Sequence, residues 1–179
     1  MALVYASMFG EIADKMAKPN ASAALVWPTV GKSYCNTYLQ AGMNAGGGAT
    51  TAVAGVGTLS MELIEINSGV VPSGVITAVK IAKAFNNCLM TYMSVYQTVI
   101  VTAPGLPLLM NDIIEISSAP TASPVEYAQK ICKALDAFTK TAIVTGIIPG
   151  TPPIPFTGCL LYTSPSPRDA TLSRMPSSA

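Results

Sequence analysis

The chain has no histidine among its 179 residues, and only 11% of its residues are charged. Without an imidazole there can be no Ser-His-Asp or Cys-His pair and no histidine-ligated zinc. The few cysteines are scattered and show no CxxC spacing, and no SxxK spacing is present. We therefore expect no catalytic residues, no cofactor and no metal, and predict that the protein is not an enzyme.

The last 21 residues, 159–179, resemble translated sequencing adapter rather than evolved protein. Cys159 to Asp169 is similar to a transposon-end adapter, and Ser173 to Ala179 to the constant segment beyond a sample index. The resemblance implies a metagenomic read that runs into adapter. We treat this tail as a non-native, unstructured segment and base the predictions on residues 1–158.

Without the tail, the charge of the chain is low and balanced. Excluding the tail removes Arg168, Arg174 and Asp169 from the count. Residues 1–158 then hold 8 of the 10 basic and 8 of the 9 acidic residues, and no arginine. A neutral chain without arginine lacks the bidentate phosphate clamp and the basic patch of nucleic-acid-binding proteins. About one residue in ten is charged, against about a quarter in typical globular proteins. Such a surface favours burial in a larger assembly, so we expect a homo-oligomer or contacts with other structural proteins.

Hydropathy raises the question of a membrane protein. The longest uncharged apolar stretch, 84–110, is interrupted by Pro104 and Pro107, whereas a transmembrane helix needs about twenty mostly apolar residues. The N-terminus meets Glu11 and Asp14 too early for a signal peptide. These features argue against membrane insertion and favour a cytoplasmic site of synthesis.

An internal repeat at an offset of fifty residues is visible without gaps. Residues 61–66 align with 111–116, and 80–85 align with 130–135. With a decayed first copy, three units at about 1–50, 51–105 and 106–150 account for the chain. The predicted fold is therefore all-α: a single domain at 1–158 in which repeated helix pairs (short helix, turn, long helix) form a compact bundle.

Each long helix is predicted from an apolar stripe with a serine N-cap. In the second unit the stripe runs from Val75 to Ile100 after Ser73, and in the third from Ala128 to Ala142 after Ser123. Lysines at matching places beside the stripes, and the repeated Glu65 and Glu115, are interpreted as solvated or structural positions. The lysines are 80, 83, 130 and 133.

Three other segments carry the interface hypothesis. The glycine cluster at 41–49 lacks the GK[ST] of a phosphate loop and is predicted to be a flexible loop. A helix at 29–40 groups Tyr34 and Tyr38 near Trp27, which could form core, a subunit contact or a ligand pocket. Residues 147–158 form a Pro-rich arm that should run extended and polyproline-like. The candidate contact residues are Trp27, Tyr34, Pro152, Pro153, Ile154, Pro155 and Phe156.

The overall pattern resembles small virion structural proteins of marine contractile-tailed phages. The resemblance rests on the Ala/Gly-rich first half, the long helix ending near 103–105, the helix after 118–120, and the closing segment 147–158. It implies a head- or tail-associated subunit in many copies, assembled in the bacterial cytoplasm. Two alternatives stay open: a membrane-associated or lysis-type protein, and a helical domain that binds a small molecule through Trp27, Tyr34 and Tyr38.

Overall fold

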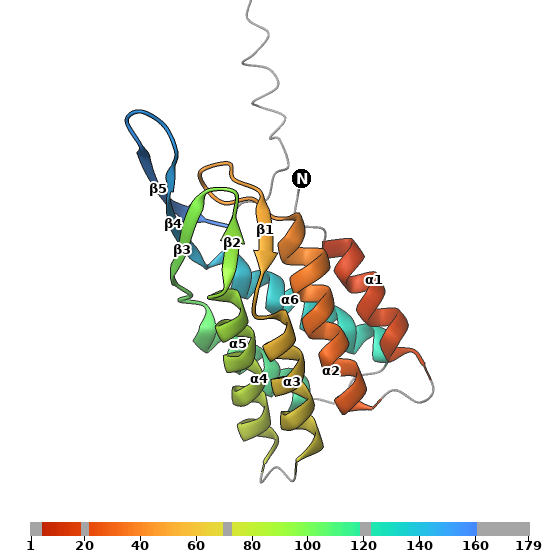
Figure 1. The fold of residues 1–179 in the computed structure, drawn as a ribbon. Coiled ribbons are helices and arrows are strands. Elements are labelled where there is room, and N and C mark those ends of the chain that lie inside the picture. Colours follow the sequence, from red (N-terminus) through yellow and green to blue (C-terminus); the bar gives the residue numbers. More distant parts are fainter. Residues whose placement is uncertain (1–4, 19–21, 70–72, 119–122, 161–179) are drawn as a thin grey trace, which may run out of the picture.

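The computed structural model describes residues 5–18, 22–69, 73–118 and 123–160 (Figure 1). Six α-helices form the body of this part of the chain, and five short strands gather at one end of the helices. The prediction of a mainly helical protein is confirmed, but the prediction of an all-α fold is wrong because the strands form two small antiparallel sheets.

The helices come in pairs of a shorter and a longer helical segment. The short helices are α1 (Tyr5–Met16), α3 (Val56–Ser68) and α5 (Leu106–Ser118). The longer segments are α2 (Ala23–Lys32) with its continuation, α4 (Gly74–Leu89) and α6 (Pro124–Lys140). Helix α5 begins and ends fifty residues after α3, and α6 begins fifty residues after α4. The matching sequence windows therefore adopt matching helices.

These helices pack in a closed cycle. Helix α2 packs on α3, α4 packs on α5, and α6 returns to pack on α1. Each longer helix thus contacts the short helix of the following pair, and the last contacts the first. The hydrophobic core of the described chain lies inside this cycle, with side chains such as Ile12, Leu63 and Ile113 almost fully buried.

The N-caps of both long helices are confirmed. The Ser73 hydroxyl accepts a hydrogen bond from the Ile76 amide at 3.3 Å, and the Ser123 hydroxyl accepts one from the Glu126 amide at 3.1 Å. Each side chain satisfies one of the amides that have no partner within the helix.

The first unit departs from the predicted helix at 29–40. Helix α2 begins at Ala23, contains Pro28, and leads into a π-helix, η1 (Ser33–Tyr38), and a 3-10 turn, η2 (Leu39–Ala41). The π-helix carries Tyr34 and Tyr38, whose rings stack with centroids 5.7 Å apart. An insertion of this kind widens one turn and re-aims the side chains that follow it.

The predicted helix through Ile100 ends eleven residues earlier, at Leu89. The Thr91 hydroxyl donates to the Cys88 carbonyl at 2.7 Å at this end, and the chain enters β2 (Tyr92–Ser94) and β3 (Gln97–Thr102). Residues 98–102 are all β-branched, and such side chains favour a strand over a helix. The local preference therefore overrides the apolar stripe.

The strands pair antiparallel in two groups. Strand β1 (Thr50–Val53) pairs with β2, and β3 pairs with β4 (Ile143–Ile148), which pairs with β5 (Ile154–Cys159). The Pro-rich segment is thus part of a hairpin rather than a polyproline-like arm, because antiparallel pairing with β4 satisfies its backbone groups. Cys159 and Leu160, assigned above to the non-native tail, belong to the described chain: Cys159 ends β5, and Leu160 is buried. Residues 161–179 lie outside the described residues.

Candidate assembly surface

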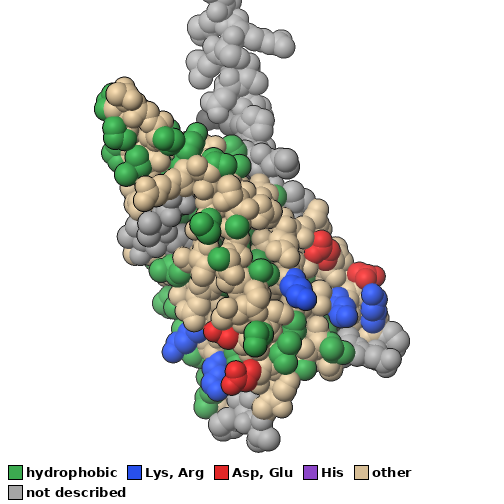
Figure 2. All heavy atoms as spheres, in the orientation of Figure 1, with side chains coloured by type: hydrophobic (Ala, Val, Ile, Leu, Met, Phe, Trp, Pro, Cys, Tyr) green, Lys and Arg blue, Asp and Glu red, His purple; other side chains and the backbone are tan. Residues whose placement is uncertain are grey.

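The strand end of the molecule carries no charge. All eight lysines and all eight acidic residues of the described chain belong to helices or follow one within two residues. Residues 33–61, 84–111 and 141–160, which include every strand, contain none. Figure 2 shows the same separation on one face, with blue and red side chains over the helices and mainly green and tan atoms toward the β4–β5 hairpin. The described chain therefore has a charged helical end and an uncharged strand end, called the sheet end below.

The sheet end exposes apolar side chains, as the helices also do, for example at Met61 and Val75. In the hairpin, 45% of Ile147 and 58% of Ile154 are exposed, and Pro152, Pro153 and Pro155 are exposed as well. Met93 in β2 and Val95 in the turn that follows it are also exposed. The β4–β5 hairpin projects beyond the helices (Figure 1). Apolar groups on a projecting element are available to a partner with little rearrangement.

Strand β5 is an edge strand within the described residues, because the sheet order is β3-β4-β5. An edge strand offers backbone donors and acceptors to a further chain. Pro155 supplies no donor and lies opposite Ile147, so it limits pairing along the outer edge. Contacts through the side chains of the hairpin are therefore favoured over simple extension of the sheet.

Phe156 anchors the hairpin to the body. Its half-buried ring lies over Gly146 of β4 and against Gly46 of the glycine cluster, and it meets the Tyr96 ring edge-on with centroids 6.5 Å apart. A Cβ at Gly46 would lie 2.7 Å from ring carbon Cδ1, and one at Gly146 would lie 2.7 Å from Cζ. Gly46 leaves room for the ring, and Gly146 leaves room both for the ring and for the Gln97 carbonyl oxygen, which is the atom nearest to a Cβ there.

The glycine cluster is an ordered loop built around Asn44, which corrects its prediction as a flexible loop. The fully buried Asn44 side chain accepts from the amides of Gly46 (3.0 Å) and Gly48 (2.9 Å) and donates to the Ser94 hydroxyl (2.7 Å). A buried amide with all these partners holds the loop in one conformation. This loop supports Phe156 and Tyr96.

The predicted contact residues separate into two groups. Trp27 and Tyr34 are 5% and 0% exposed and pack edge-on against Phe85, with centroids 6.4 Å and 5.3 Å from its ring. These two side chains are core residues of one chain, since their apolar surfaces are already covered. The hairpin residues Pro152, Pro153, Ile154 and Pro155 are exposed, and Phe156 bridges the hairpin and the loop.

The hydroxyl groups of the two tyrosines in the first unit already have hydrogen-bond partners within the chain. Hydroxyl groups of Tyr34 and Thr139 lie 2.6 Å apart, and the Tyr38 hydroxyl donates to Asp136 at 2.6 Å. The Trp27, Tyr34 and Tyr38 surface predicted for a small molecule is therefore filled by protein atoms. Sequence reasoning missed Asn44 and Tyr96, for which the spacing of the glycines was the available signal.

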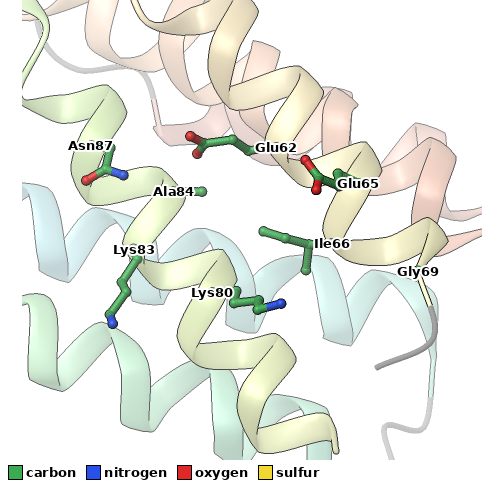
Figure 3. Close-up of a pocket in the computed structure, with 8 residues that line it drawn as sticks. All are labelled: Glu62, Glu65, Ile66, Gly69, Lys80, Lys83, Ala84 and Asn87. Carbon is green, nitrogen blue, oxygen red and sulfur yellow. The ribbon is translucent and has the colours of Figure 1, made fainter. Parts of the chain in front are cut away.

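The repeated charged residues line two shallow hollows between helices. Glu62 and Glu65 of α3 line a hollow of about 430 Å³ together with Lys80 and Lys83 of α4, and the Lys83 side chain points away from the glutamates (Figure 3). The equivalent hollow between α5 and α6 measures about 340 Å³ and is lined by Asp112, Glu115, Lys130 and Lys133. Lys80, Lys83 and Lys133 are exposed, as the sequence predicted for the lysines, whereas Lys130 and Asp112 are half-buried. Burial and the neighbouring Glu115 raise the pKa of Asp112.

Within the described residues, no helix combines the length and apolar character needed to cross a bilayer. No protein-family model matches the chain, and no curated protein or solved structure shows significant similarity to it.

Proposed function

We propose that the protein is a non-catalytic structural subunit that self-assembles through its sheet end. The observation that carries this proposal is the separation of charge: every strand lies in an uncharged segment, and the projecting hairpin exposes Ile147 and Ile154. Removing charges from water opposes association, and the centres of protein interfaces are depleted in them. The sheet end can be covered without that cost, whereas the helical end keeps the charges that interact with solvent.

A second copy of the same chain is the partner that these features favour. An uncharged surface has no charge pattern that would select a partner of opposite sign. Apolar side chains on a projecting element are self-complementary under a two-fold axis, and the same surface on both subunits is the commonest arrangement in homo-oligomers. Many copies joined in this way would form a larger structure without any chemical step.

We further infer that the chain is three copies of one unit, in which two helices are followed by a pair of strands in the second and third copies. The support is the fifty-residue spacing of α3 and α5, the cyclic packing of the six helices, and two equivalent hydrogen bonds. The Gly55 amide donates to the Thr91 hydroxyl at 2.8 Å, and fifty residues later the Gly105 amide donates to the Thr141 hydroxyl at 2.9 Å. The first unit has the isolated bridge Met43↔Ala49 after its helices, at the place of the two strands of the later units.

The larger structure that we propose is a phage particle, in which the protein is a head- or tail-associated subunit assembled in the host cytoplasm. This step rests on the sequence resemblance to virion proteins, together with the low charge and the apolar sheet end. A virion protein needs surfaces that bind one another, and the low charge of the sheet end supports such binding.

The experiment is the solution mass of the full chain, measured by sedimentation velocity over a concentration series without detergent. We expect an oligomer that dissociates when Ile154→Lys or Ile147→Lys places a charge on the hairpin. Met61→Lys is the matched control, because Met61 is apolar and 72% exposed but lies on helix α3 and not on the hairpin. A wild-type chain that stays monomeric at about millimolar concentration would overturn the proposal. A solution mass that changes when detergent is added would favour the alternative of a membrane-associated protein.

A further inference from the structure

Two buried cysteines from different units face each other in the core. Cys35 lies in η1 and Cys88 near the end of α4, and their Sγ atoms are 3.0 Å apart. Cys35 is 0% and Cys88 3% exposed. A disulfide has an S–S distance of about 2.05 Å, so bond formation requires an approach of about 1 Å.

We propose that Cys35 and Cys88 are a latent redox pair that a small oxidant, such as a peroxide, converts to an intrachain disulfide joining η1 to α4. Cys132 is buried as well but has no part in this pair, and Cys159 is exposed on β5. The proposal therefore concerns one specific pair among the four cysteines of the chain.

One of the two cysteines borders a hollow that is large enough for a small molecule. Cys88 lines a hollow of about 170 Å³ together with Gly55, Leu59 and Thr91, between α3 and the end of α4. Cys35 is not part of the lining of that hollow. Oxidation should therefore begin at Cys88 and be completed from inside the core by Cys35.

The chemistry balances with one peroxide. The Cys88 sulfur attacks an oxygen of hydrogen peroxide, the O–O bond breaks, and a sulfenic acid and one water form. The Cys35 sulfur then attacks the Cys88 sulfur, and the S–O bond breaks. The hydroxide that leaves takes the Cys35 proton and departs as a second water. Two thiols are oxidised by two electrons in total, and the peroxide is reduced to two waters.

The surroundings of Cys35 determine the rate of the second step, in which the Cys35 sulfur attacks the Cys88 sulfur. The hydrogen bond with Cys88, followed by burial, raises the pKa of the Cys35 thiol. The thiolate is the attacking species, so a raised pKa slows attack. We expect a reaction that takes place over minutes to hours rather than seconds, and faster at alkaline pH.

The proposal does not rest on self-assembly, because the bond forms within one chain. If the protein leaves its host in a particle, as proposed above, it also leaves the reducing cytoplasm for surroundings in which disulfides persist. The bond would then fix the first unit to the second after release.

The test uses the reduced full chain, treated with a small molar excess of hydrogen peroxide, unfolded, alkylated and mapped by mass spectrometry. We expect a linked Cys35–Cys88 peptide about 2 Da lighter than the two free peptides, and an alkylated Cys132 as the internal control. Closing a loop of this size should raise the melting temperature by about 10 °C, and dithiothreitol should reverse the rise.

Cys88→Ala is the matched variant, and its melting temperature should not respond to peroxide. If this variant does not fold, the wild-type peptide map decides alone. The proposal is overturned if Cys35 and Cys88 both carry the alkyl group after treatment of the folded protein, or if Cys88 is found linked to Cys159. Either result would leave the sedimentation test of self-assembly unaffected.

Discussion

The Phe156 ring occupies the place that a side chain at Gly46 would need, since a Cβ there would come 2.7 Å from ring carbon Cδ1. The two residues are 110 positions apart, yet their contact decides how the hairpin sits on the loop. We expect Gly46→Ala to displace the ring and to lower the free energy of unfolding by about 1–3 kcal/mol, the usual cost of overpacking.

Chemical denaturation checks this prediction, with Gly10→Ala as the control. A Cβ at Gly10 meets nothing within 4 Å, and Gly10 lies inside α1. The control should therefore gain about 0.5–1 kcal/mol, because alanine is a better helix former than glycine. Equal stability changes of the same sign in the two variants would contradict the described packing.

The second prediction concerns the buried Asn44 amide. Asn44→Ala removes the acceptor for two loop amides and the donor to Ser94, so we expect a loss of about 2–4 kcal/mol from groups left unsatisfied. Asn87→Ala is the control, since Asn87 is exposed on α4 and should change stability by less than about 0.5 kcal/mol. Hydrogen exchange should show faster exchange at the Gly46 and Gly48 amides in the first variant only.

The third prediction tests the equivalence of the second and third units. Thr91→Val and Thr141→Val each remove a hydroxyl that accepts from a glycine amide and donates to a helix carbonyl. Each should cost about 1–2 kcal/mol, and the double variant should show the sum, because distant sites usually act independently. Clearly unequal losses in the single variants would argue against a common building block.

The fourth prediction is a loss of stability at alkaline pH. Burial raises the pKa of Tyr92 above its ordinary value of 10.0, and the hydrogen bond with Thr50 opposes this shift only in part. The folded state therefore holds the phenol proton more tightly than the unfolded state. The contribution of the protonated Tyr92 to the free energy of unfolding is fully present below pH 10. It is lost as the pH rises from there through the pKa of Tyr92 in the folded state.

Melting temperatures between pH 8 and about pH 11 measure this effect. Tyr92→Phe cannot ionise at that position, so its melting temperature should fall less steeply over the same range. A slope identical to that of the wild type would show that Tyr92 does not contribute to the alkaline loss.

The helices could be predicted from the sequence where local signals agree. Ser73 and Ser123 each stand before an apolar stripe, and both are observed N-caps. The stripe beyond Leu89 was wrong as a helix: Met93, Tyr96 and Ile100 continue a helical spacing, but Ile100 lies in the β-branched run 98–102, which favours a strand. Two periodicities were compatible with the same residues, and the β-branched preference for a strand overrode the helical spacing.

The sheet end could be predicted only in part. Prolines mark the hairpin as non-helical, but its pairing with β4 depends on a chain reversal at 149–153. Asn44 bonds to Ser94, fifty residues away, and no local pattern identifies such a partner. The burial of Trp27 and Tyr34 could not be predicted either, because composition does not distinguish aromatic residues of the core from those of a subunit interface.

The return of α6 to α1 changes how the molecule can grow. Stacked helical repeats normally present an uncovered face at each terminus, and further repeats or further molecules can add there. Here the first and last helices cover each other, so that route is closed. Polymerisation along the helical layer is thereby prevented, and any lattice built from this subunit must propagate through its other surfaces.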